Sequence, residues 1–176
     1  MQFLVSLPNT QFKQLMILTI IRQFLCLRYI LLNMWQILLS VESINLTKSQ
    51  YKHLKDISRK AQPFEGCALL LGYVTEKKVK ITDIIPTKNI DRSKVTFKID
   101  STTVFKVYEQ ADKENKEVIG VFHSHPTPPR PSSLDIQYMS VNPIVWLILS
   151  TTNLKISAYQ MLDKQIKLIK VINKKN

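Results

Sequence analysis

Hydrophobic residues recur at helical spacing in two parts of the chain beyond residue 40, which predicts helices between Thr47 and Pro63 and over residues 102–113. A short helix is also predicted over residues 133–140, after the Pro-rich stretch at residues 127–131. Thr47 and Gln50 have the spacing of a capping box, which ties down the first free amides of a helix. Pro63 ends this helix, because the residue before a proline disfavours helical backbone.

Between these helices, short apolar or alternating runs predict strands. The predicted strands are residues 43–46, 67–74, 79–85, 95–99, 117–122, 144–150, 155–160 and 166–171. Strands interspersed with helices are typical of an α/β or α+β fold, here as a single domain over residues 41–176.

Residues 1–40 form a separate extension that is rich in Leu, Ile, Phe and Met. Arg22 and Arg28 interrupt the apolar run, and each arginine near a bilayer centre costs about 2.5 to 3.5 kcal/mol, so a single membrane span is disfavoured. The segment also lacks the basic start and cleavage site of an export signal. Two interpretations stay open: an amphipathic segment at a membrane surface, or a mis-assigned start with translation beginning at Met34, which is favoured.

The composition indicates a folded chain with an excess of positive charge. Hydrophobic residues make up 45% and charged residues 22%, which are globular values. The net charge of +12 favours acidic partners, but the lysines are scattered and do not interleave with aromatic residues, so nucleic acid is disfavoured as the main partner. With only Cys26 and Cys67, no disulfide framework is predicted, and a reducing cytoplasm fits best.

Two histidines at the end of a predicted strand suggest a metal site. His123 and His125 lie two residues apart, so on an extended chain their imidazoles project to the same side. Pro126 restrains His125 to an extended backbone. Asp135 can add a carboxylate, and two histidines with one carboxylate leave a fourth zinc position open for water. This set indicates a catalytic zinc site.

The other candidate residues also have interpretations without catalysis. Ser132 and Asp135 have the spacing of a capping box, which needs no metal. Glu65, just before the strand predicted over residues 67–74, can be a surface carboxylate. Cys67 is interpreted as a small buried hydrophobe and not as a nucleophile. The residues taken singly leave the alternatives for Asp135 and Glu65 open.

Three segments together resemble the JAMM, or MPN-plus, metalloprotease family in order and context. They are PFEGCALLLG at residues 63–72, VFHSHP at 121–126 and PSSLD at 131–135. The resemblance covers residues 43–172. It implies a cytidine-deaminase-like α/β fold, with a mixed central sheet flanked by helices.

The resemblance also implies a role for each candidate residue. The ligands of one zinc ion per chain would be His123, His125 and Asp135. Glu65 would be the general acid and base, and Ser132 would be the hydroxyl that stabilises the oxyanion. The family usually has seven residues between the second histidine and the serine, whereas here there are six. Ser133 therefore stays an alternative to Ser132.

The implied function is removal of a ubiquitin-like modifier, by hydrolysis of the amide between its C-terminal glycine and a lysine side chain or peptide. The short segment after Asp135 favours a compact prokaryotic or archaeal type. Two alternatives stay open: trimming of the C-terminus of a sulfur-carrier protein, and a non-catalytic scaffold of MPN type. Such scaffolds generally lose the metal ligands, whereas this sequence keeps them.

Overall fold

The structure is a computed structural model that describes residues 40–174. In chain order it contains β1 (Ser43–Thr47), α2 (Lys48–Ala61), β2 (Cys67–Thr75), β3 (Lys78–Thr87), α3 (Ser101–Lys113), β4 (Glu117–His125), α4 (Ser133–Met139), β5 (Val145–Ser150), β6 (Ile156–Leu162) and β7 (Gln165–Lys174). The predictions made for residues 1–39, including the start at Met34, lie outside the described residues. Within residues 40–174, no helix is both long enough and apolar enough to cross a membrane.

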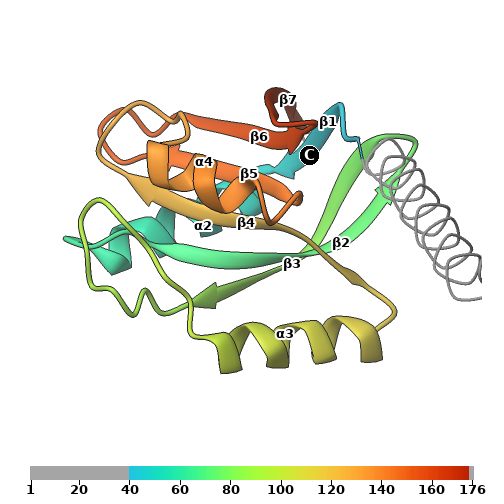
Figure 1. Ribbon diagram of the computed structural model, residues 1–176, viewed down its shortest axis with the longest axis horizontal. Coiled ribbons are helices and arrows are strands. Elements are labelled where there is room, and N and C mark those ends of the chain that lie inside the picture. The colour runs from blue at the N-terminus through green and yellow to red at the C-terminus, as the bar shows by residue number, and fades with distance from the viewer. Residues whose placement is uncertain (1–39, 175–176) are drawn as a thin grey trace, which may run out of the picture. The chain divides into compact units, whose positions relative to one another are not determined.

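The seven strands described form one mixed sheet that closes on itself (Figure 1). Their order is β1-β3-β2-β4-β5-β6-β7, and β1 pairs with both β3 and β7. β1 is parallel to both neighbours and β4 is parallel to β5, while the other neighbouring pairs are antiparallel. The predicted α/β class with a mixed sheet is confirmed, and closure into a barrel is an addition to it. A relation to cytidine deaminases stays a prediction.

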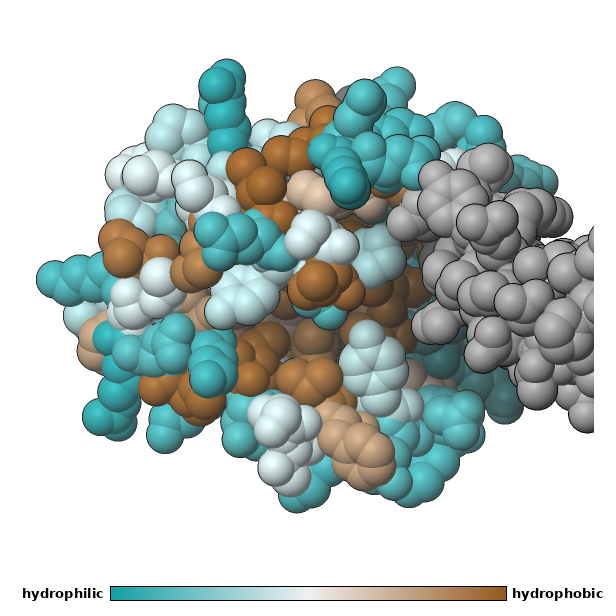
Figure 2. Space-filling view, viewed as in Figure 1, coloured by the Kyte–Doolittle hydropathy of each residue, from teal (hydrophilic) through white to brown (hydrophobic). Residues whose placement is uncertain are grey.

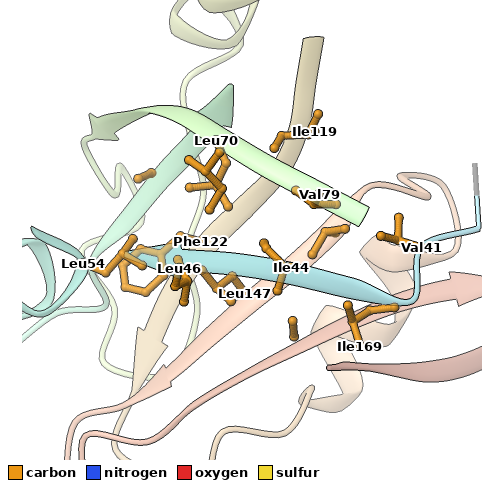
Figure 3. Packing of buried hydrophobic residues seen from close by; sticks show 14 of the residues in the cluster. Val41, Ile44, Leu46, Leu54, Leu70, Val79, Ile119, Phe122, Leu147 and Ile169 are labelled. Atoms are coloured by element: carbon orange, nitrogen blue, oxygen red, sulfur yellow. The ribbon is translucent and has the colours of Figure 1, made fainter. Parts of the chain in front are cut away.

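The first hydrophobic core lies inside the closed sheet, because all seven of these strands contribute side chains to it. Figure 3 shows Ile44 and Leu46 of β1 among side chains of the neighbouring strands, with Leu54 of α2 packed beside them. Phe122 of β4 is fully buried in this core. Each fully buried Leu or Phe contributes roughly 1.5 to 3 kcal/mol, so the core firmly holds the strands that carry the candidate site.

The second core lies on the outer face of β2, β4 and β5, where side chains of α3 and α4 join it. Successive side chains of a strand point to opposite faces, so Val121 of β4 belongs to the second core while Phe122 belongs to the first. His123 lies beside Trp146, which belongs to the second core as Val121 does. The two histidines of β4 therefore project from the outer face of the sheet.

The predicted helices are confirmed, and the caps explain where two of them begin. Thr47 and Gln50 form both bonds of the predicted capping box at the start of α2. Asp100 caps α3 by accepting a hydrogen bond from the amide of Thr103. Seven of the eight predicted strands are also present, with ends that differ by at most three residues, and β4 extends far enough to include both histidines.

The strand predicted over residues 95–99 is wrong. This segment is part of an irregular loop between β3 and α3. The side chain of Asn89 accepts a hydrogen bond from the amide of Lys98. In a strand, a carbonyl of the neighbouring strand would accept this hydrogen bond. Of the three apolar residues in the alternation, Phe97 and Ile99 pack against the second core, whereas Val95 is 69% exposed.

Candidate metal centre

The pairing of β2 with β4 brings Glu65 to the histidines. Cys67 lies opposite His123 in this antiparallel pair, and Glu65 precedes Cys67 by two residues. The carbonyl of Gly66 accepts a hydrogen bond from the amide of Ser124 at 3.0 Å, and the amide of Gly66 donates to the Ser124 hydroxyl at 3.1 Å. Two segments far apart in the sequence are thus held in register at one end of the sheet.

Gly66 allows the start of β2 to approach α2 closely. A β-carbon at this position would lie 3.0 Å from the Cα atom of Ser58 and 3.1 Å from the carbonyl oxygen of Ile57. Both are backbone atoms of α2, so they cannot move aside as the end of a side chain can. The position of the neighbouring Glu65 depends on this close contact.

Three side chains suited to binding a metal converge at the end of β4. One potential ligand atom from each of His123, His125 and Asp135 lies within 4.8 Å of the others. The histidines belong to the last three residues of β4, and Asp135 belongs to the first turn of α4. All three residues are buried, with exposed fractions of 1% for His123 and 5% for each of the others.

His123 is surrounded in a way that leaves its ring nitrogens unsatisfied. Neither nitrogen has a hydrogen-bond partner among residues 40–174, although Nε2 lies 3.4 Å from Oδ1 of Asp135. Phe97 stacks on the ring with centroids 4.6 Å apart, and Trp146 meets it edge-on. A buried polar group without a partner costs about 1 to 3 kcal/mol, which a bound metal ion would relieve.

Asp135 caps α4 and faces the histidines at the same time. Its Oδ2 atom accepts hydrogen bonds from the amide and the hydroxyl of Ser132, each at 2.7 Å, while its Oδ1 atom faces His123. Burial raises the pKa of Asp135, but the nearby His123 and the hydrogen bonds from Ser132 outweigh burial and lower the pKa to about 2. The carboxylate is therefore ionised at neutral pH, as a metal ligand must be.

His125 is held through both of its ring nitrogens. Nε2 donates to the carbonyl of Arg130 at 3.2 Å, since a carbonyl can only accept, and Nδ1 then accepts from the hydroxyl of Thr127 at 2.8 Å. Burial and the nearby His123 lower the pKa of His125, which keeps the ring neutral. A metal ion on one nitrogen would replace one contact and leave the other to orient the ring.

Glu65 is only 4% exposed, so its interpretation as a surface carboxylate is wrong. Burial and the nearby Asp135 raise the pKa of Glu65 to about 8. Its amide donates to the carbonyl of Ser93 at 3.0 Å, and its carbonyl accepts from the side chain of Asn89 at 3.3 Å. A buried carboxyl group with a raised pKa suits a residue that takes up and returns protons near neutral pH.

The two candidate serines differ in their contacts with the site. The Ser132 hydroxyl accepts a hydrogen bond from the amide of Asp135 at 3.1 Å and donates to its carboxylate. Ser133 is the first residue of α4, and within the described chain no hydrogen bond joins its hydroxyl to a site residue. Ser132 is therefore the serine that adjoins the candidate ligands.

Cys67 is fully buried at the start of β2, in agreement with its interpretation as a small hydrophobe. Its sulfur lies 3.3 Å from the hydroxyl of Thr87. Burial raises the pKa of the thiol, which disfavours the thiolate that a nucleophile needs.

Several residues that hold the site in place escaped the sequence analysis. They are Asn89, Phe97, Thr127 and Trp146. Thr127 alone carries a local signal, because a hydroxyl two residues after a histidine can reach back to the ring. The other three reach the site through the fold, so only the arrangement of the loop and the strands identifies them.

Comparison with known proteins agrees with this geometry. Residues 47–162 match the family described as prokaryotic homologs of the JAB domain, and this range contains every candidate residue. A desampylase from Pyrococcus furiosus is 37% identical over 87 residues, which are 49% of this chain and 59% of that protein. The match thus spans less than two thirds of that relative's length.

Solved structures share the fold. A solution structure of a protein from Desulfitobacterium hafniense matches with a TM-score of 0.68 and 27% identity, over 76% of this chain and 94% of that one. A solution structure of a protein from Salinibacter ruber matches with a TM-score of 0.57 and 21% identity, over 75% and 91% of the two chains. The second likeness shows the fold alone.

Proposed function

Because this chain belongs to the family of prokaryotic homologs of the JAB domain, the JAMM class that its motifs resemble, we propose that it is a zinc-dependent isopeptidase. Its reaction is hydrolysis of the amide between the C-terminal glycine of a ubiquitin-like modifier and a lysine of a conjugated protein. The observation that carries this proposal is the convergence of His123, His125 and Asp135 within 4.8 Å, with the buried Glu65 at the same end of the sheet.

The three candidate ligands fit one zinc ion per chain. Two imidazoles and one carboxylate are a usual catalytic zinc set. Asp135 is ionised at neutral pH, and His123 has buried nitrogens that find no hydrogen-bond partner within the described part of the chain. When bound, zinc polarises the amide carbonyl and lowers the pKa of a water molecule at the site to about 7.

The protein side chains supply the rest of the chemistry. Glu65 takes a proton from the attacking water and returns it to the leaving amine, a role typically worth about 10² to 10⁴ in rate. The hydroxyl of Ser132 turns from Asp135 to the developing oxyanion, and loss of such a donor commonly lowers the rate by about 10² to 10³. Of the two contacts that orient the ring of His125, with Thr127 and with the carbonyl of Arg130, the one on the nitrogen that does not bind zinc would remain.

Two observations support a protein modifier as the substrate. The relative from Pyrococcus furiosus is named a desampylase. Figure 2 shows apolar surface on the face that carries α3 and α4, and exposed apolar patches are typical of protein-binding sites. The exposed hydrophobic side chains of these helices and of the loop before α3 include Val95, Phe105, Tyr108, Ile136 and Tyr138.

Two other functions are distinguished by experiment. Trimming a sulfur-carrier protein would use the same residues on a linear peptide bond. A non-catalytic scaffold has less support, because the full set of candidate ligands converges. A cytoplasmic location stays a prediction.

The test uses zinc-loaded protein with two kinds of substrate. In one, ubiquitin or an archaeal ubiquitin-like modifier is joined through its C-terminal glycine to a lysine side chain of a fluorescent peptide. In the other, the same peptide is a linear C-terminal extension of the modifier. We expect release from the branched substrates, slowed about 10² to 10⁴-fold in Glu65→Gln with zinc content unchanged.

Glu117→Gln serves as the matched control, because Glu117 is exposed at the start of β4. This variant should cleave at the wild-type rate. Equal rates in wild type and Glu65→Gln would contradict the proposed chemistry. Release from the linear substrates alone would favour the trimming function.

A further inference from the structure

A groove of about 590 Å³ opens beside Glu65. Its walls are α2, the end of β3 and the loop that follows β3. Glu65 and Gly66 line it, whereas none of the three candidate ligands does. The groove therefore adjoins the proposed proton carrier and not the metal ligands.

Positive charge prevails in this groove. Its cations are Lys60, Lys88 and Arg92. All three are exposed, and none forms an ion pair within residues 40–174. Apart from Glu65, the acidic residue of the lining is Asp56, which already pairs with Arg59 at 3.2 Å. The groove thus holds three cations whose charges are not offset by a bonded carboxylate.

The chemistry of the proposed hydrolysis decides which half of the substrate meets this groove. A general acid must come within about 2.6 to 3.2 Å of the atom that it protonates. Glu65 returns its proton to the leaving nitrogen, and that nitrogen belongs to the modified lysine of the acceptor protein. The acceptor chain must therefore pass Glu65, where the groove provides space for the residues on either side of the lysine.

We propose that this groove binds acidic residues that flank the modified lysine of the conjugated protein. The inference rests on the proposed function and extends it from the bond that is cleaved to the choice of acceptor. Carboxylates supply the negative charge that would balance the three cations. Ile57 and Phe64, which is 36% exposed, also line the groove and give the methylene groups of glutamate side chains an apolar surface. Rim charges of this kind act mainly on encounter and on specificity.

Two substrates test this inference with the full-length, zinc-loaded protein. Each carries ubiquitin or the archaeal modifier on the lysine of a fluorescent peptide, with two glutamates on each side of the lysine in one and glutamines in the other. We expect about a fivefold lower KM for the acidic acceptor at low salt with little change in kcat, and a smaller difference at high salt. Equal KM values for the two acceptors would overturn the inference.

Paired charge reversals show whether the groove is responsible. Lys88→Glu with Arg92→Glu should reverse the preference toward the glutamine acceptor. Lys48→Glu with Lys52→Glu makes the same change of charge at exposed residues of α2 that do not line the groove, and should keep the preference. Loss of the preference in both double variants would trace it to net charge and overturn the inference. Lys88→Gln with Arg92→Gln should weaken the preference without reversing it, because Lys60 keeps its charge in the groove.

A binding measurement separates this inference from the proposed function. The two acceptor peptides, without any modifier, are titrated into the wild-type protein and followed by fluorescence anisotropy. If neither conjugate is cleaved but the acidic peptide binds the wild type more tightly, and Lys88→Glu with Arg92→Glu removes this difference, the proposed function fails while the affinity of the groove for acidic residues is upheld. If both conjugates are cleaved with equal KM and the two peptides bind alike, the proposed function holds and the groove inference fails.

Discussion

Glu65 links the stability of the metal-free protein to pH. Burial and the nearby Asp135 raise its pKa from 4.5 to about 8 in the folded state. Between these two values the folded state holds a proton on Glu65 that the unfolded chain has released. The folded state is therefore destabilised as pH rises through this range, and the loss is complete only above pH 8. A bound cation would favour the ionised form and oppose this trend.

We expect the metal-free wild type to lose about 1 kcal/mol of unfolding free energy relative to Glu65→Gln between about pH 7 and 8.5. The variant keeps the shape of the side chain but cannot ionise. Urea denaturation at the two pH values measures the difference, and the lowered pKa of His125, which does not depend on Glu65, affects both proteins alike. If the two proteins respond equally to pH, the pKa of Glu65 in the folded state lies near its ordinary value.

Asp135 shows which details of the site the sequence could predict. Its spacing in the sequence predicts two alternative roles, in a capping box or as a metal ligand. The side chain has two oxygens, and the structure gives Oδ2 to Ser132 and turns Oδ1 toward His123. A motif can identify the set of residues, but the direction of each oxygen depends on how α4 is set against β4.

At the scale of elements, the first turn of α4 combines a helix cap with a candidate ligand. We expect Ser132→Ala to lower the free energy of unfolding by about 0.5 to 2 kcal/mol, because α4 loses its cap. The same variant should hydrolyse the branched substrate about 10² to 10³ times more slowly, because a donor to the oxyanion is removed. Thermal unfolding and single-substrate kinetics measure the two effects.

Ser133→Ala is the matched control, since it removes the neighbouring exposed hydroxyl. It should resemble the wild type in both measurements. The reverse result, with Ser133→Ala impaired and Ser132→Ala unaffected, would mean that the usual gap of the family identifies the serine.

The loop between β3 and α3 depends on one asparagine. The side chain of Asn89 forms hydrogen bonds with backbone groups of Glu65, Asp91, Thr96 and Lys98. We expect Asn89→Ala to destabilise the fold by about 1 to 3 kcal/mol, because buried groups lose their partners. Its kcat should fall more than its KM rises, since the backbone of Glu65 loses one of its anchors. Urea denaturation and steady-state kinetics test both statements.

Asn153→Ala is the comparison for this variant. The side chain of Asn153 accepts a hydrogen bond from the amide of Lys155 in an exposed turn. Equal losses in the two variants would show that Asn89 has no special influence on the site.

The same loop explains why part of the fold was not predictable. The alternation at residues 95–99 reflects the packing of Phe97 and Ile99 against the second core, and Phe97 also stacks on His123. The alternation does not indicate which backbone groups pair with each other. Here the side chain of Asn89 accepts the hydrogen bond from the amide of Lys98. The helices and the other strands were predictable because capping residues and long apolar runs act within one element.

At the scale of the whole molecule, the candidate ligands join two elements, β4 and α4, on the outer face of the sheet. Zinc that binds only the folded state at about 100 times its Kd would stabilise the protein by about 2.7 kcal/mol. We therefore expect a chelator to lower the Tm and added zinc to restore it. Calorimetry with elemental analysis measures both, and one zinc per chain is expected.

Asp135→Asn should lose most of this response to chelator and zinc. A wild type that keeps the same Tm and no bound zinc under both conditions would contradict the proposed metal centre.

The ring of strands is completed by β7, which lies parallel to β1 with Lys170 opposite Ser43. All of the candidate site residues lie between these two strands in the sequence. While the ribosome is still making the chain, β1 has an unpaired edge, and such edges invite aggregation. Every chemical group of the site is thus synthesised before the strand that closes the barrel.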